Sequence, residues 1–154
     1  MLEVLFNYLR NGGLPFLFLL IFIEANPVIG SFVPGQVIVV FVGFLISAAN
    51  LYNLYLAFLV VFLASFFGDL FGYYLGRKYG LSGLKVFGLN NKSKVYQTSY
   101  SFFKKYGSWS IILGREFNFT RAFIPFFAGC FGMSLWSFVG FALLSCFLWT
   151  VISI

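Results

Sequence analysis

The sequence predicts an all-α polytopic membrane protein, and three observations support this class. Of its 154 residues, 61% are hydrophobic and 24 are phenylalanine. Only 9% are charged, about a third of the share in typical globular domains. The same order of apolar and polar segments occurs in both halves. We therefore expect a single membrane domain, residues 1–154: an inverted repeat of a re-entrant helical hairpin plus a transmembrane helix, with interfacial amphipathic helices.

Composition also narrows the possible functions. The formal net charge of +6, in a chain this apolar, indicates membrane topology and anionic headgroups rather than nucleic acid. Histidine is absent and Asp69 is the only aspartate, which argues against His-assisted nucleophiles, zinc sites and aspartyl dyads. We expect no enzyme, no metal and no cofactor. Cys130 and Cys146 lie in apolar runs and fit small-residue packing better than a disulfide.

The two ends of the chain lead to further expectations. Residues 1–11 place Leu2, Leu5, Phe6 and Leu9 at helical spacing, which predicts a short interfacial helix. No cleavage pattern of a secretory signal accompanies it, so we expect no removable signal peptide. At the other end the sequence stops within an apolar run. This indicates either a further tail or a last helix that ends at the interface.

A polar break between two short apolar blocks predicts the first re-entrant hairpin. The blocks, residues 14–23 and 37–49, are each too short to cross about 30 Å of hydrocarbon. Irregular backbone survives at that depth only where protein or a water cavity surrounds it. The alternative is one span with a proline kink, which four helix breakers within nine residues disfavour. The break contains Glu24, Pro34, Gly35 and Gln36.

Residues 51–76 predict a complete span. Small residues recur at every fourth position on one face, which permits close approach of another helix. Asp69 lies beside that face, with Tyr73 one turn further on and within reach. We expect Asp69 to join a buried polar network; the alternative is a helix-end residue at the interface, since Arg77 follows eight positions later. The small residues are Ala64, Gly68, Gly72 and Gly76.

Residues 77–106 form a basic loop that contains no acidic residue. By the positive-inside rule we expect this loop to face the cytoplasm. Its apolar positions between residues 95 and 106 form an amphipathic stripe, which predicts a second interfacial helix on an anionic leaflet, ended by Gly107. The basic residues are Arg77, Lys78, Lys85, Lys92, Lys94, Lys104 and Lys105.

The second half repeats the order of the first. Repeat 1 covers about residues 1–76 and repeat 2 about residues 107–154, with a final span over residues 135–154. A hairpin returns to its own side and one span crosses, so the second repeat must be inverted, and the two polar breaks can meet within the membrane. The second break contains Arg115, Glu116, Asn118, Arg121 and Pro125.

Two arginines are the candidate centre of a site. A charge at the bilayer centre costs about 3 kcal/mol, so three unpaired charges would cost roughly 9 kcal/mol. On an unbroken helix Arg115 and Arg121 would point about 120° apart. If Asn118, Thr120 and Pro125 interrupt the helix, both guanidinium groups can converge as a bidentate clamp for phosphate or carboxylate. The alternative is an ordinary charged loop between two spans.

In several motifs the chain resembles the DedA family, also described as SNARE-associated or VTT-domain membrane proteins. Glu24 and the FVPGQ segment, residues 32–36, resemble the family's glutamate and Pro-Gly-acid motif. Residues 68–80 resemble its Gly-Asp…Tyr…Gly-Arg span. Residues 115–133 resemble its Arg-Phe-x-Pro-x-x-Arg and Ala-Gly-x-x-x-Met segment. The resemblance covers roughly residues 5–150 and keeps the motifs in order.

Two positions depart from the family pattern. Gln36 replaces the expected acid, which weakens any proton coupling taken over from the family. Glu116 and Asn118 stand where the family usually has Phe and Pro. We expect Glu116, beside Arg115, to restore an acid from the opposite hairpin.

The resemblance implies a membrane transporter that translocates a phosphorylated lipid, either a polyprenyl phosphate or a phospholipid headgroup. In this hypothesis the arginines hold the phosphate, the acids balance them in the empty site, and the small-residue face of residues 64–76 leaves room for lipid tails. The implied partners are membrane lipid and protons, in a multi-pass plasma-membrane protein. The candidate substrate-binding residues are Arg115, Arg121, Glu24, Gln36, Asp69, Glu116, Asn118 and Tyr73, with Pro34, Gly35 and Pro125 as structural breaks.

Two other functions remain open from the sequence. A proton-coupled antiporter of small ions would use Glu24 as a desolvated, titrating carboxylate. A membrane scaffold that transports nothing would use the same charges only to lock the two hairpins together.

Overall fold

A computed structural model describes residues 13, 15–25, 40, 43, 54–86, 94–116, 121 and 123–153, and these are almost entirely helical. The predicted helix over residues 1–11 and the break residues Pro34, Gly35, Gln36 and Asn118 lie outside the described residues. The longer helices are Pro15–Glu24, α3 (Leu54–Tyr79), α5 (Lys94–Tyr106), α7 (Phe123–Cys130) and α8 (Leu135–Ser153). Shorter pieces are α4 (Gly83–Val86), α6 (Ser110–Leu113) and the 3-10 turns Gly80–Ser82, Gly107–Trp109 and Gly114–Glu116.

Two of the described helices are long and apolar enough to cross a membrane. They are α3, with its 3-10 extension to Ser82, and α8. At 1.5 Å per residue, the 26 residues of α3 extend about 39 Å and the 19 of α8 about 28 Å. The helices predicted over residues 51–76 and 135–154 are therefore confirmed. The re-entrant hairpins and the inverted repeat stay predictions.

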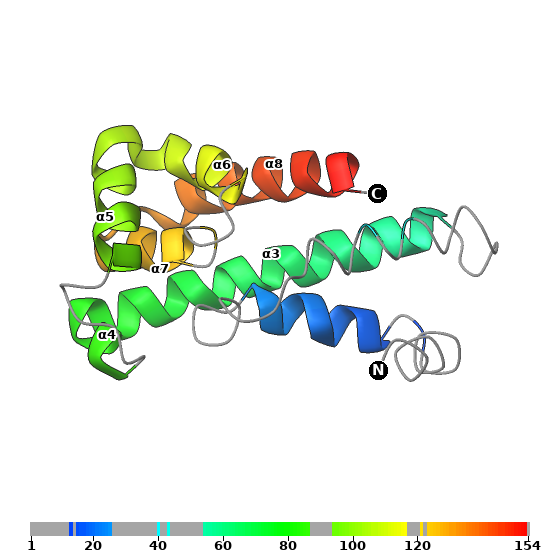
Figure 1. Cartoon of the computed structure of the whole chain (residues 1–154), viewed down its shortest axis with the longest axis horizontal. Coiled ribbons are helices and arrows are strands. Elements are labelled where there is room, and N and C mark those ends of the chain that lie inside the picture. The colour runs from blue at the N-terminus through cyan, green and yellow to red at the C-terminus, as the bar shows by residue number, and fades with distance from the viewer. Residues whose placement is uncertain are drawn as a thin grey trace.

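Helix α3 forms the long axis of the molecule (Figure 1). The helix Pro15–Glu24 lies along one side of it, where Leu17 and Ile21 pack with Val61. Helices α7 and α8 pack against α3 as well, and α5 packs against α7. The core is therefore built around α3, against which the helix Pro15–Glu24, α7 and α8 pack.

The small-residue face of α3 brings two other backbones very close. A Cβ atom on Gly68 would lie 2.3 Å from the Cβ of Ala25, and one on Gly76 would lie 1.9 Å from the carbonyl oxygen of Phe126. The predicted close approach is confirmed. The expectation of room for lipid tails along residues 64–76 is wrong, because protein fills this face.

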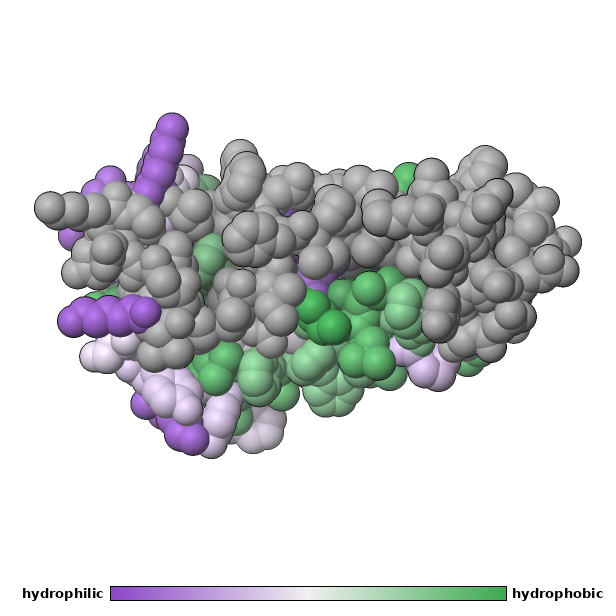
Figure 2. Space-filling model, turned by 60° about the horizontal axis from the view of Figure 1, so that its bottom comes forward, coloured by the Kyte–Doolittle hydropathy of each residue, from purple (hydrophilic) through white to green (hydrophobic). Residues whose placement is uncertain are grey.

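The amphipathic stripe of α5 packs on protein. Phe103 is buried in the core and stacks on Phe131, while the rings of Tyr96 and Tyr100 contact Phe127 of α7. Packing on α7 therefore accounts for the amphipathic pattern. The opposite face is exposed and carries lysines, and Figure 2 shows hydrophilic side chains at the end of the molecule where α4 and α5 lie. A place at the membrane interface stays a prediction.

Of the two helix breaks predicted at Gly107 and Pro125, the structure has the first but not the second. Gly107 has a φ of 54°, a left-handed conformation that favours glycine, and α5 ends before it as expected. Pro125, predicted as a break, instead lies in the first turn of α7, where proline is tolerated because the first amides have no helical partner. Helix α6 ends at Leu113, a 3-10 turn follows over Gly114–Glu116, and Arg121 lies in a turn before α7 begins.

We expect Gly129→Ala to destabilise the fold by about 1–3 kcal/mol, toward the upper end because the new Cβ would meet backbone. It would lie 2.1 Å from the Tyr73 carbonyl oxygen and 2.7 Å from the Arg77 nitrogen. Unfolding in mixed detergent micelles, followed by circular dichroism, measures this change. The matched control is Gly140→Ala on α8, whose Cβ meets no atom within 4 Å and which should gain about 0.5–1 kcal/mol from helix propensity. Equal effects would contradict the close approach of α3 and α7.

Candidate functional site

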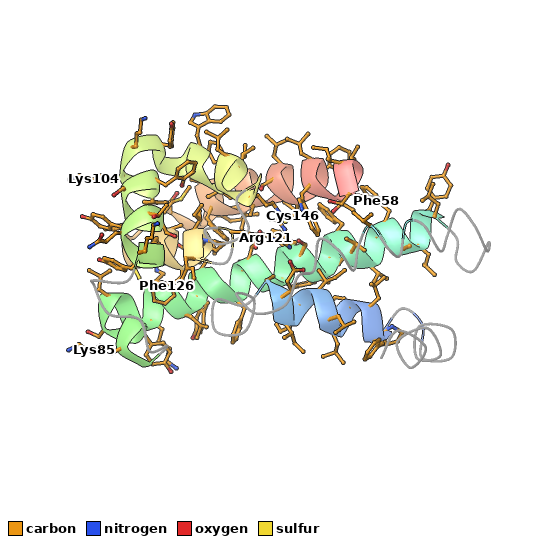
Figure 3. All side chains as sticks on the ribbon, viewed as in Figure 1. Phe58, Lys85, Lys104, Arg121, Phe126 and Cys146 are labelled. Atoms are coloured by element: carbon orange, nitrogen blue, oxygen red, sulfur yellow. The ribbon has the colours of Figure 1, made fainter. Side chains whose placement is uncertain are left out.

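Two buried ion pairs lie at the centre of the molecule. Arg115 Nη1 is 2.5 Å from Asp69 Oδ2, and Arg121 Nη1 is 2.7 Å from Glu24 Oε1. All four side chains are at most 7% exposed. Figure 3 labels Arg121 close to Cys146 of α8, on the side of that helix toward α3. Acids and guanidinium groups of distant segments therefore meet inside the apolar bundle, as a buried charge requires.

Helix structure determines where each charge is presented. Asp69 lies in the middle of α3, which rules out a helix-end position near the interface. Glu24 is the last residue of its helix. Arg115 lies in the short 3-10 turn that follows α6, and Arg121 lies just before α7 begins. Both arginines therefore lie between α6 and α7, outside a regular α-helix.

The Arg115 guanidinium is held by several partners. Besides Asp69, its Nη1 donates to Cys146 Sγ at 3.2 Å, and its Nη2 donates to Ser65 Oγ. The thiol of Cys146 in turn donates to Asp69 Oδ2 at 3.4 Å. Four side chains from three segments thus form one connected network, and such a network fixes the position of Arg115.

The Arg121 guanidinium is much less satisfied. Its Nη1 donates to Glu24, but its Nε and Nη2 have no hydrogen-bond partner among the described residues, although both atoms are buried. Nε and Nη2 form one edge of the planar guanidinium, the edge that binds two oxygens of a carboxylate or phosphate at once. A buried donor without a partner costs about 1–3 kcal/mol. This edge of Arg121 therefore has the donor geometry that suits an oxyanion, and it has no partner among the described residues.

A tryptophan on α8 brings the two arginines together. The Cζ atom of Arg121 is 4.2 Å from the centroid of the Trp149 ring, and that of Arg115 is 5.2 Å from it. Trp149 is buried. Both guanidinium groups therefore converge on one indole ring, although a continuous helix would point them apart.

Other predicted site residues have different positions. The hydroxyl of Tyr73 donates to the Met133 carbonyl at 2.5 Å and accepts from Arg77 Nη1 at 2.7 Å, so it fastens the α7–α8 turn to α3. Glu116 ends a 3-10 turn, and its side chain lies outside the described part of the chain. Gln36 and Asn118 lie outside it altogether. Asp69, Glu24 and the two arginines are the predicted residues that the structure brings together.

Sequence reasoning missed three members of the site. Ser65 lies four residues before Asp69, so helical spacing could have shown that they share a face. Cys146, expected only to pack, contacts both charges of one pair. Trp149 gave no signal, because an aromatic residue in an apolar span is usually core or lipid-facing. Within the described residues no group of three or more His, Cys, Asp or Glu lies together as a metal site.

Comparison with known proteins identifies related chains. A family model described as the VTT domain matches residues 33–154. Protein DedA of Escherichia coli (strain K12) is 33% identical over 142 residues, which cover 88% of this chain and 63% of the relative. The uncharacterized membrane protein YbfM of Bacillus subtilis is 30% identical over 129 residues, 82% of this chain and 79% of the relative.

A further relative carries a functional name. It is undecaprenyl phosphate transporter A of Staphylococcus aureus, 27% identical over 153 residues, 96% of this chain and 73% of the relative. The chain spans less than two thirds of the length of several relatives, including the DedA protein above. No solved structure matches the chain.

We expect Asp69→Ala to destabilise the fold by about 3–5 kcal/mol, because it leaves the Arg115 charge buried with only a hydroxyl and a thiol beside it. The double variant Asp69→Ala/Arg115→Met should lose less than Asp69→Ala alone, since neither charge then remains. Unfolding in mixed micelles for the two single variants and the double variant measures the coupling. Additive losses would contradict a pairing that matters to the fold.

Proposed function

Because the chain belongs to the VTT-domain family, the DedA family of membrane proteins, we propose that it is a membrane transporter that carries a phosphorylated lipid across the bilayer. The lipid is a polyprenyl phosphate or a phospholipid with a phosphate headgroup. The proposal is supported by a relative named as an undecaprenyl phosphate transporter and by the chemistry of the two buried ion pairs.

The observation that carries the proposal is the unsatisfied edge of Arg121. A phosphate group presents two oxygens at the spacing of the Nε and Nη2 hydrogens, and in a dry site this pairing is both strong and directional. Glu24 engages only Nη1, so a phosphate can bind the Nε–Nη2 edge while that ion pair is kept. Both donors are buried, so the lipid headgroup reaches them only when neighbouring segments move.

The two arginines have different roles in this proposal. Arg115 is anchored by Asp69, Ser65 and Cys146, and it acts mainly as a fixed positive charge that attracts the headgroup. Arg121 makes the direct contact. In the empty site two carboxylates balance two guanidinium groups. A bound phosphate adds negative charge, which the partial positive charge of two unpaired N–H groups accommodates best.

The buried pairs also favour a second candidate function, that of a scaffold. Glu24 and Arg121 are 97 positions apart, and Asp69 and Arg115 are 46 apart, so both pairs fasten distant segments together. A scaffold needs nothing more than this fastening. A transporter also needs the unpartnered edge of Arg121. Substitutions that keep the ion pair but remove this edge therefore distinguish a transporter from a scaffold.

Arg121→Lys tests the transporter directly. Lysine keeps the charge for Glu24 but loses the two-donor edge, so we expect lipid translocation to fall about tenfold or more, close to the level of Arg121→Ala. The assay follows a fluorescent polyprenyl phosphate across proteoliposomes, and native mass spectrometry checks for a co-purifying phosphorylated lipid. The control, Lys104→Arg on the exposed face of α5, should translocate as the unchanged protein does. Full activity of Arg121→Lys would contradict the proposal.

The charge swap Glu24→Arg/Arg121→Glu tests the scaffold. Each single change places like charges together and should lower stability, while the double variant should recover the fold, since an opposite pair is rebuilt. We expect this folded double variant to remain inactive in the proteoliposome assay, because the arginine now projects from the wrong helix. If the double variant recovers both the fold and the activity, the Glu24–Arg121 pair serves only to hold the two segments together, as in a scaffold.

A further inference from the structure

Trp149 is the feature of this site that neither the family nor the charges explain. Its ring lies under two guanidinium groups, with Arg121 the nearer at 4.2 Å. It also packs in a core cluster with Leu17, Ile21 and Val61. Filling that core requires only an apolar side chain. Two cations over one ring require an aromatic face, whose negative quadrupole attracts them, and the attraction is stronger where water is excluded.

The indole is itself held firmly. Its helix is joined to α6 by a hydrogen bond from Ser145 Oγ to the Ile111 carbonyl at 3.0 Å. One turn before Trp149, Cys146 contacts both members of the Arg115–Asp69 pair. The ring is therefore fixed relative to the anchored arginine, and it offers Arg121 a surface that does not depend on Glu24.

We propose that Trp149 is a positioning residue, which keeps the Arg121 guanidinium in one orientation whether or not Glu24 is engaged. The Nε–Nη2 edge then stays directed into the site while an oxyanion binds and leaves. This inference rests on the proposed function for the identity of the oxyanion. Without the indole, the Glu24 carboxylate would be the only described contact that orients Arg121. The orientation of the guanidinium would then change whenever Glu24 moved.

The first test needs no lipid. Trp109 and Trp136 are 60% and 86% exposed and lie outside the site, so Trp109→Phe/Trp136→Phe leaves Trp149 as the only tryptophan. In this background, ultraviolet resonance Raman bands of the indole report a cation over the ring. We expect Arg121→Gln to weaken that signature and Glu24→Gln to preserve it. An equal loss in Glu24→Gln would overturn the inference, because Arg121 would then leave the ring with its carboxylate.

The second test measures binding of farnesyl phosphate to the protein in detergent micelles, with farnesol as the uncharged control. We expect Trp149→Leu to raise the Kd for farnesyl phosphate about tenfold, and Trp149→Phe, which keeps a weaker aromatic face, to remain within about threefold of the unchanged protein. Thermal unfolding of both variants checks that they fold. If Trp149→Leu does not fold, the Raman comparison decides alone.

The outcomes separate this inference from the function on which it rests. Tighter binding of farnesyl phosphate than farnesol, lost in Trp149→Leu and kept in Trp149→Phe, supports both. Equal binding by Trp149→Leu and the unchanged protein overturns the role of Trp149 and leaves the proposed function standing. If the unchanged protein does not prefer farnesyl phosphate over farnesol, the proposed function fails, and the role of Trp149 in oxyanion binding fails with it.

Discussion

A guanidinium group inside an apolar bundle costs several kcal/mol unless a carboxylate lies beside it, and this constraint determines which segments of the chain must meet. Arg115 meets Asp69 and Arg121 meets Glu24. The first pair joins the α6 region to the middle of α3, and the second joins the start of α7 to the end of the helix Pro15–Glu24. An arrangement that separated either pair would leave charges buried alone, which is far less favourable.

Close backbone packing places these charges accurately. Gly76 and Gly129 let α3 and α7 touch through backbone atoms, and Gly68 does the same for the residue after Glu24. At the far end of α7, Tyr73 and Arg77 fasten the Met133 carbonyl to α3. Helix α7 is thus held against α3 at its middle and its far end, and Arg121, two residues before its start, is presented from this support.

The two ion pairs differ in how completely they are satisfied, and the difference separates stability from function. In the Arg115 pair both Nη atoms have partners, namely a carboxylate, a thiol and a hydroxyl, and only Nε lacks one among the described residues. The Arg121 pair leaves two buried donors without a described partner, which a fold optimised for stability alone would avoid. These two donors are the basis of the phosphate contact proposed for Arg121.

Composition and spacing along one helix were enough to predict the membrane class, the long apolar helices at residues 51–76 and 135–154, the small-residue face and the acids and arginines of the candidate site. The sequence by itself did not reveal that the stripe of α5 packs on α7 or that Pro125 lies inside α7, since periodicity does not show what covers a face. The three-dimensional structure was needed to show which acid meets which arginine, that both Nη atoms of Arg115 have partners while only one of Arg121 does, and that both guanidinium groups lie over Trp149. These contacts join residues far apart in the chain, and their geometry depends on how closely whole helices approach.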